Sequence, residues 1–363
     1  MTPTTVVRTP HLVLEWREGR LVATDGATGR RHAVTVEAMR VLDAADEPAT
    51  PAELAARTGA EPAEVLALLA AGLLVRKERC PERHRWSALE LVVQRTARTV
   101  RPPQEREADR AAMPPPAKEA PGPPCELPAA DPGTAPESGR EGGPADGAAA
   151  DPPFSRVLAG RRSCRRFAPD PVGAATLGRF LDMACAVQHD ARDMGSGVSW
   201  RPHPSGGGRH PLETYVYPLN VAGLDRAVYH YDPFRRRLDQ VAGAEATLFE
   251  TARTLHRECE LMDGEPAVVL VITAVFERTM WKYDNGGLLI IHQDAGALYQ
   301  TFYLVATALG LGGCALGGGS DAVVTRALGL DPLREGHVGA FLLGVPADDR
   351  HLDPRQDLGA TLR

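Results

Sequence analysis

No apolar run in this 363-residue sequence is long enough to cross a membrane. The longest, Ala267–Phe276, has about half the length that a spanning helix needs. The first residues lack a charged segment followed by an apolar core, so we expect no secretory signal. The net charge of −6 gives no general attraction to nucleic acid or to an anionic membrane.

Cysteine is sparse, with six residues and no CxxC pair. This scatter over a long chain indicates free thiols in a reducing cytoplasm rather than a disulfide framework or a zinc site. The spacing of His189, His203 and His210 fits no metal motif, and HExxH is absent. The GxSxG elbow of an α/β-hydrolase is also missing.

Residues 1–80 resemble a small winged-helix-like module. The predicted strands are the two arms of a hairpin that turns at Gly19 and a closing strand: Leu12–Trp16, Leu21–Ala23 and Leu73–Arg76. Three helices are expected. The first lies near Val36, the second begins at Pro51 with a capping box formed by Thr50 and Glu53, and the third spans Pro62–Ala71.

Such modules often bind DNA, but the charge of the third helix argues against it here. This helix carries Glu61 and Glu64 and has no basic residue, whereas a helix in a major groove needs basic or amide side chains. A peptide-docking module, in which an extended segment adds to the edge of the hairpin, is the alternative. A purely structural domain is the third possibility.

Residues 81–153 change in composition. Trp86–Gln94 is predicted to be a helix, and Arg101–Pro153 is dominated by Pro, Ala, Gly and charge. Such a stretch cannot bury enough apolar surface to fold alone. It is therefore a linker or an arm that lies on another surface.

Residues 154–363 mix helices and strands without strict βαβ alternation, which favours an α+β fold. The predicted helices are Phe154–Ala159, Thr176–Val187, Glu245–Arg257, Leu288–Leu309 and Ala322–Leu328. The predicted strands are Glu213–Pro218, Val228–Tyr231, Arg237–Val241, Ala267–Phe276, Gly313–Leu316 and His337–Val345.

Three segments of this part could carry chemistry. Arg161–Phe167 places four arginines around Ser163, a pattern that suits a phosphate but also occurs in solvated basic turns. Pro204–Pro211 contains three consecutive glycines that would let a flat ligand approach the backbone, although a flexible loop is the plain alternative. Lys282 and Tyr283 form a candidate acid–base pair, although a surface pair of this kind is commoner.

A fourth segment, Gly310–Ala315, fits the GxGxxA fingerprint of dinucleotide-binding proteins. Its context is wrong, because the glycines follow a predicted helix and open a strand, whereas the fingerprint lies between a strand and a helix. We therefore reject a Rossmann site.

Taken in order, RRSCRRF, PSGGGRHPLE, WKY, DAGALYQ and LGLGGCALGG resemble the flavin-dependent nitroreductase superfamily. More narrowly, they are similar to its azoline dehydrogenase branch, the SagB-type thiazole/oxazole oxidases of ribosomal peptide biosynthesis. Pro114–Gly122 resembles the PPxxKxYPG stretch common in that branch. The module at residues 1–80 also matches, since several members carry a peptide-clamp domain there.

This resemblance implies a nitroreductase-like homodimer with FMN at the subunit interface. The implied FMN-binding residues come from three of the motifs: Arg161, Arg162, Ser163, Arg165, Pro204, Ser205, Gly206, Gly207, Gly317 and Gly318. Arg165 would lie near the pyrimidine edge of the flavin, and Ser205 with Gly206 near its N5 and O4 atoms. Lys282 and Tyr283 match the pair proposed as the catalytic base.

The implied activity is FMN-dependent oxidation of azoline rings to azoles on a precursor peptide. Its leader would dock on residues 1–80, and a cyclodehydratase is a possible partner. The branch usually continues as KYGxRxYRY, but here the Arg and Tyr residues after Tyr283 are absent. Two alternatives therefore stay open: an NAD(P)H-dependent nitro, quinone or ene reductase, and a degenerate scaffold that binds leader peptide.

Overall fold

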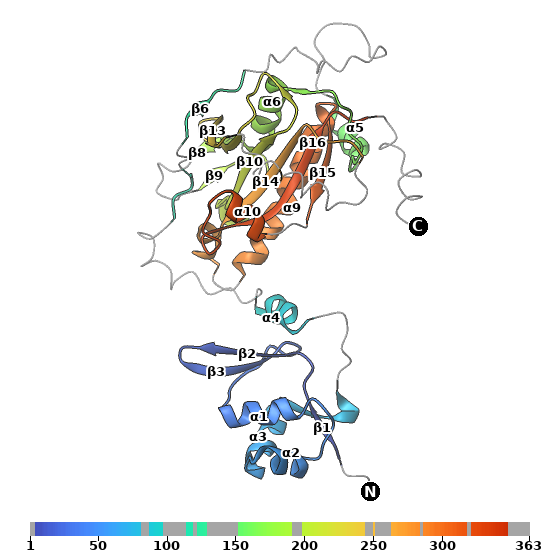
Figure 1. The fold of residues 1–363 in the computed structure, drawn as a ribbon, viewed down its shortest axis with the longest axis vertical. Coiled ribbons are helices and arrows are strands. Elements are labelled where there is room, and N and C mark those ends of the chain that lie inside the picture. Colours follow the sequence, from blue (N-terminus) through green and yellow to red (C-terminus); the bar gives the residue numbers. More distant parts are fainter. Residues whose placement is uncertain are drawn as a thin grey trace. The chain divides into compact units, whose positions relative to one another are not determined.

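The computed structural model describes residues 4–80, 87–96, 114–118, 122–128, 152–190, 198–243, 250, 263–283, 286–317 and 321–347. The chain divides into two compact units, Met1–Arg101 and Pro102–Arg363 (Figure 1). Each unit is described by itself below.

The N-terminal unit combines two small antiparallel sheets with helices. Its strands are β1 (Val6–Arg8), β2 (Leu12–Arg17), β3 (Arg20–Asp25), β4 (Arg31–Ala33) and β5 (Leu74–Arg76). They form a three-stranded sheet in the order β2-β3-β4 and a separate β1–β5 pair. The helices are α1 (Val36–Ala44), α2 (Pro51–Thr58), α3 (Pro62–Ala71), a 3-10 turn at Lys77–Arg79, and α4 (Ala88–Thr96).

Local sequence explains these elements. Glu18 and Gly19 both have positive φ, as a two-residue hairpin turn requires, so β2 and β3 pair tightly around them. The capping box that starts α2 is present, with Thr50 and Glu53 each accepting a hydrogen bond from the other's backbone. The predicted hairpin, the three helices and the closing strand are therefore confirmed, whereas β1 and β4 were not predicted. The winged-helix assignment stays a prediction.

The C-terminal unit is built on a seven-stranded antiparallel sheet in the order β15-β16-β14-β10-β12-β13-β6. Its strands are β6 (Pro124–Cys125), β10 (Leu212–Pro218), β12 (Val228–Asp232), β13 (Arg237–Ala242), β14 (Val268–Val275), β15 (Gly312–Leu316) and β16 (Glu335–Gly344). Four shorter strands form two pairs outside it: β7 (Val172–Gly173) with β11 (Val221–Ala222), and β8 (His189–Asp190) with β9 (Ser199–Trp200). The predicted α+β class is confirmed.

Helices pack against this sheet (Figure 1). They are α5 (Phe154–Gly160), α6 (Ala174–Cys185), α8 (Phe276–Met280), α9 (Gly287–Ala308) and α10 (Asp321–Ala327). The rings of Phe180 on α6, Phe302 on α9 and Phe341 on β16 meet in the core. The ring centre of Phe302 lies 5.3 Å from that of Phe180 and 5.2 Å from that of Phe341. Observed limits lie within about two residues of the predicted ones, and the predicted helix at 245–257 lies outside the described residues.

The predicted linker, residues 81–153, behaves as an arm of the C-terminal unit at its described residues 114–118 and 122–128. Its residues 124–125 form β6, which pairs with β13 at the edge of the main sheet, although they precede the predicted start of the domain at residue 154. Of the two alternatives for this stretch, its described residues match the arm. The exact domain limits stay a prediction.

Two other expectations concern the whole chain. The five described cysteines, Cys80, Cys125, Cys164, Cys185 and Cys314, are all free thiols. Among the described helices, none combines the length and the apolar character that crossing a bilayer requires.

Candidate functional site

The arginine-rich turn after α5 is held by a tyrosine of α9. The Ser163 Oγ lies 2.9 Å from the hydroxyl of Tyr303, which also accepts a 2.8 Å hydrogen bond from the backbone N–H of Ala315 on β15. The guanidinium of Arg161 sits 5.1 Å from the centre of the Tyr303 ring. Tyr303 therefore fixes this turn against α9 and β15, a role that the sequence motifs did not indicate.

The four arginines of the turn differ in their partners. Arg162 donates to two backbone carbonyls of its own turn, and Arg166 lies 3.7 Å from the carboxylate of Asp263. Among the described residues, no carboxylate pairs with Arg161 or Arg165, which are half-buried. Guanidinium groups without a carboxylate partner are suited to bind an anion such as phosphate.

The glycine turn is held by a carboxylate, also from α9. The Ser205 hydroxyl donates to Asp294 at 2.6 Å, and the Gly206 N–H donates to the same carboxylate at 3.0 Å. Ser205 Oγ also accepts a 2.9 Å bond from the backbone N–H of His210. Burial raises the pKa of Asp294, and these hydrogen bonds oppose that rise. Asp294 lies in the DAGALYQ motif, but the sequence of that motif does not indicate this role.

These bonds decide which donors of the turn can reach a ligand. The Ser205 hydroxyl proton and the Gly206 N–H are already committed to Asp294, and the Gly208 N–H donates to the Ser205 carbonyl. Within the described part of the chain, the Gly207 N–H has no acceptor. Gly207 has a φ of +64°, so the turn suits a glycine here. Its amide is the donor best placed for a flat ligand.

The lysine–tyrosine pair meets the same glycine. Lys282 and Tyr283 follow α8, and a Cβ built on Gly207 would lie 2.8 Å from the Lys282 amine and 3.1 Å from the Tyr283 hydroxyl. The amine is also 5.4 Å from the centre of the Tyr283 ring. The predicted base and the predicted flavin loop are thus brought together, and only a residue without a side chain leaves room for both.

The two halves of the predicted site lie on opposite faces of α9. Asp294 and Tyr303 are nine residues apart, which corresponds to about two and a half turns and roughly 13 Å along the helix axis. The arginine turn and the glycine turn of one chain are consequently fixed to different sides of this helix. Among the described residues, each half has free donors that fit FMN: two guanidinium groups on one and the Gly207 amide on the other.

The other predicted residues are placed less tightly. Pro204 is exposed at the start of the glycine turn, and a Cβ on Gly317 would meet nothing within 4 Å. Gly318 lies outside the described residues. The small cavity of about 10 Å³ beside Arg201 and Tyr231 has room for one water and contains none of the predicted residues.

Known proteins resemble mainly the C-terminal unit. The profile described as the Nitroreductase family matches residues 158–345, just over half of the chain. A nitroreductase homologue of Methanocaldococcus jannaschii is 31% identical over 176 residues, which are 47% of this chain and 82% of that protein.

Two further relatives are named for peptide processing. The microcin B17-processing protein McbC of Escherichia coli is 31% identical over 162 residues, 42% of this chain and 57% of McbC. The trifolitoxin-processing protein TfxB of Rhizobium leguminosarum is 32% identical over 145 residues, 39% of this chain and 38% of TfxB. The family profile matches over half of the chain, and the fold is α+β with an antiparallel sheet. The chain therefore belongs to the nitroreductase family and is an oxidoreductase.

Proposed function

We propose that this protein is an FMN-dependent dehydrogenase that oxidises azoline rings to azoles, or performs a related oxidation, on a ribosomal peptide precursor. The observation that carries the proposal is the meeting of Lys282 and Tyr283 at Gly207, in the turn expected to face the flavin. The names of McbC and TfxB, both peptide-processing proteins, support a peptide substrate.

The chemistry requires a base next to a hydride acceptor. Converting an azoline to an azole removes a proton from the α-carbon and a hydride from the adjacent ring carbon. When bound, FMN supplies the hydride acceptor. Tyr283, with Lys282 beside it, receives the proton, and Asp294 holds the glycine turn so that the Gly207 amide faces the ligand.

FMN would be held by both halves of the site. Arg161, Ser163 and Arg165 would bind the phosphate, the ribityl chain or the pyrimidine edge. The two guanidinium groups have no carboxylate partner among the described residues, and Ser163 adds a hydroxyl. Gly207 would donate its amide N–H at the flavin ring. Arg162, Pro204 and Gly317, together with Gly318, remain proposed ligands on the family resemblance alone.

The opposite placement of the two halves supports a homodimer. The arginine turn and the glycine turn of one chain lie on different faces of α9, so a second copy offers a way to bring one of each together. We therefore propose that two chains share each flavin site.

The N-terminal unit is the proposed docking site for the leader of the precursor. A groove of about 600 Å³ lies beside β2, whose described residues pair on one side only, with β3. The lining residues are Arg8, Thr9, Pro10, Leu12, Leu14, Met39, Arg40, Leu42 and Asp43. An extended peptide can add to such an edge while its side chains enter the groove. A cyclodehydratase that forms the azoline is the expected partner.

The test is a direct assay of the FMN-loaded protein with an azoline-containing precursor. Mass spectrometry should show the loss of two hydrogens for each ring, with no need for NAD(P)H. The M. jannaschii relative, a nitroreductase homologue, supports the second candidate, an NAD(P)H-dependent reductase. NAD(P)H oxidation with a nitro or quinone substrate, without any peptide oxidation, would favour that candidate instead.

A further inference from the structure

The arm, residues 114–118 and 122–128, belongs to the C-terminal unit and packs along its main sheet. The Gln240 N–H donates to the Pro123 carbonyl at 3.0 Å, and β6 continues this pairing along β13. A Cβ on Gly122 would clash with the Gln240 carbonyl, so the backbones approach as closely as only glycine allows. This part of the arm is therefore fixed along the sheet edge.

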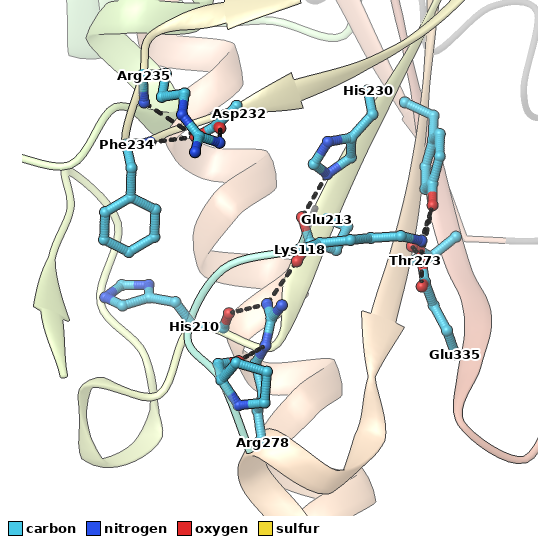
Figure 2. A network of polar contacts seen from close by, with 12 residues as sticks. Lys118, His210, Glu213, His230, Asp232, Phe234, Arg235, Thr273, Arg278 and Glu335 are labelled. Carbon is cyan, nitrogen blue, oxygen red and sulfur yellow. Dashed lines mark hydrogen bonds and ion pairs between the residues drawn. The ribbon is translucent and has the colours of Figure 1, made fainter. Parts of the chain in front are cut away.

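Lys118 anchors the other part of the arm in a buried polar cluster (Figure 2). Its ammonium lies 2.6 Å from the carboxylate of Glu335, at the start of β16, and also bonds the Tyr215 hydroxyl. Glu335 accepts further hydrogen bonds from Tyr215 at 2.9 Å and Thr273 at 2.7 Å. Because Glu335 is buried, Lys118 supplies the cation that compensates its charge.

Between these anchors and the proposed active site lie two buried arginines that bind the arm's backbone. The Arg278 Nε donates to the Pro115 carbonyl at 2.9 Å, and the Arg209 guanidinium donates to the Pro114 carbonyl at 3.5 Å. Arg278, which is 2% exposed, also pairs with Glu213 at 2.5 Å (Figure 2). A fully buried guanidinium needs each of these acceptors, so the arm completes its environment.

The same arginines hold the residues that lead into the catalytic pair. Arg278 belongs to α8, and Arg209 donates from Nε to the Arg278 carbonyl at 2.9 Å while its guanidinium lies 5.2 Å from the Trp281 ring centre. The backbone N–H groups of Lys282 and Tyr283 both donate to the Thr279 carbonyl of α8, each at 3.0 Å. A displacement of α8 would therefore displace the pair.

We propose that the arm positions the catalytic base: residues 114–118, acting through Arg278 and Arg209, hold α8 so that Lys282 and Tyr283 stay against Gly207. This inference rests on the proposed function of that pair. The arm residues touch neither substrate nor flavin in this account and are positioning residues. The N-terminal arm of the C-terminal unit is thereby a working part of the active site.

The test uses the full-length, FMN-loaded protein and three variants. Lys118→Met removes the anchoring ammonium and keeps much of the side-chain stem, and Lys118→Met/Glu335→Gln also removes the carboxylate that would be left without a cation. Arg235→Met is the matched control, because it likewise removes the cation partner of a buried carboxylate, that of Asp232. Among the described residues, Arg235 has no contact with residues 114–118. The double variant keeps the test informative where the single variant unfolds.

A displaced base should slow the chemistry without changing binding. Misplacing a catalytic group by about 1 Å costs roughly a hundredfold. We therefore expect kcat to fall about ten- to a hundredfold in the single and double Lys118 variants, with KM for the azoline peptide within about twofold. The kinetic isotope effect from deuterium at the α-carbon should rise, because proton removal becomes more rate-limiting. Arg235→Met should leave both unchanged.

Recovery of kcat in the double variant would overturn the inference, since it would show that Lys118 only compensates Glu335. An unchanged kcat and isotope effect in a folded Lys118→Met variant would overturn it as well. These results are distinguishable from a failure of the proposed function. If the proposed function is wrong, the unaltered protein will oxidise no azoline peptide. If only the role of the pair is wrong, Tyr283→Phe will oxidise the peptide at the normal rate.

Discussion

Tyr283 and Lys282 are the residues whose loss should affect chemistry most and flavin binding least. Both polar groups lie at Gly207, while the anchors of the arginine turn and the glycine turn are other residues. Tyr283→Phe and Lys282→Ala should each lower the rate of azoline oxidation by about a hundred- to ten-thousandfold, the usual cost of losing a general base. Mass spectrometry gives the rate, and visible absorbance gives the bound FMN.

Tyr229→Phe is the matched control for the Tyr283 variant. It removes a tyrosine hydroxyl that donates to the backbone carbonyl of Asp225, four residues earlier in the chain. Its rate should equal that of the unaltered protein. Rates near normal in both Lys282→Ala and Tyr283→Phe would show that the pair is an ordinary connection between two helices, and would move the assignment towards the reductase.

His203 should make the protein sensitive to mild acid. It is buried, its Nδ1 lies 3.2 Å from the Ala184 carbonyl, and burial together with the charge of Arg201 lowers its pKa to about 4. Below about pH 6.5 the unfolded chain protonates His203, whereas the folded chain does so only near pH 4. The neutral buried imidazole therefore costs no stability above pH 6.5, and the free energy of unfolding falls as the pH drops towards 4. The loss from this one group amounts to about 3 kcal/mol.

Urea unfolding at pH 7 and pH 5 measures this effect. His203→Gln keeps a group that can bond to Ala184 but cannot be charged, so its unfolding midpoint should fall less between the two pH values than that of the unaltered protein. His189→Gln, at an exposed position, should change nothing. An identical pH dependence in His203→Gln and the unaltered protein would contradict the assignment of a neutral buried imidazole.

At the scale of elements, α9 connects the turns of the site. Asp294→Asn should loosen the glycine turn. The carboxylate accepts hydrogen bonds from the Ser205 hydroxyl and the Gly206 N–H on its two oxygens, and in the amide one of these oxygens is replaced by an NH₂ group, which cannot accept. Hydrogen bonds to a charged group are worth about 1.5–3 kcal/mol, so FMN affinity should fall roughly ten- to a hundredfold. Titration of the apoprotein with FMN, followed by flavin fluorescence, gives the Kd.

Asp182→Asn serves as the control for this variant. Asp182 lies on the other long helix, α6, and accepts a hydrogen bond from the Tyr231 hydroxyl. Among the described residues it has no contact with the glycine turn. Its FMN affinity should be unchanged. If Asp294→Asn binds FMN as tightly as the unaltered protein, the conformation of the turn does not depend on the carboxylate.

Elements differ in how far their sequences determine them. α9 and β14 were predicted within one residue, because a long apolar helix and a continuous Val-Val-Leu-Val-Ile run carry enough local signal. β1 and β6 have three and two residues, and each exists only because a partner strand lies alongside it. No local pattern in a proline-rich stretch indicates that Pro124 will pair with Asp239.

At the scale of the whole molecule, we expect a yellow homodimer with about one FMN per chain. The arginine turn and the glycine turn are fixed to opposite faces of α9, which favours a site shared by two chains. Light scattering and the absorbance ratio of flavin to protein measure both properties. A monomer with full flavin occupancy would refute the shared site, and a colourless protein that takes up no added FMN would refute the flavin assignment.

The N-terminal unit should matter for long substrates only. Deletion of residues 1–80 should reduce activity on a full-length precursor much more than activity on a short leaderless azoline peptide. Its α3 carries Glu64 and no basic residue, so duplex DNA should show no salt-dependent binding to the intact protein. Equal losses on both substrates would indicate a structural role for the unit rather than leader docking.

The sequence by itself determined the class, the helices and strands with strong periodicity, and the residue types of the site. Arginines around Ser163, consecutive glycines after Ser205 and the Lys282–Tyr283 pair are local signals, because the chemistry of each lies within a few neighbouring residues. Their order along the chain carried the family resemblance, which the match to residues 158–345 bears out.

Only the tertiary structure decided how these signals combine. Asp294 and Tyr303 are ordinary positions of an apolar helix until the fold brings them to Ser205 and Ser163. The contact of Lys118 with Glu335 joins residues from opposite ends of the C-terminal unit. Buried charges and hydrogen bonds depend on which groups meet when the sheet closes, and a sequence pattern records spacing along the chain rather than proximity in space.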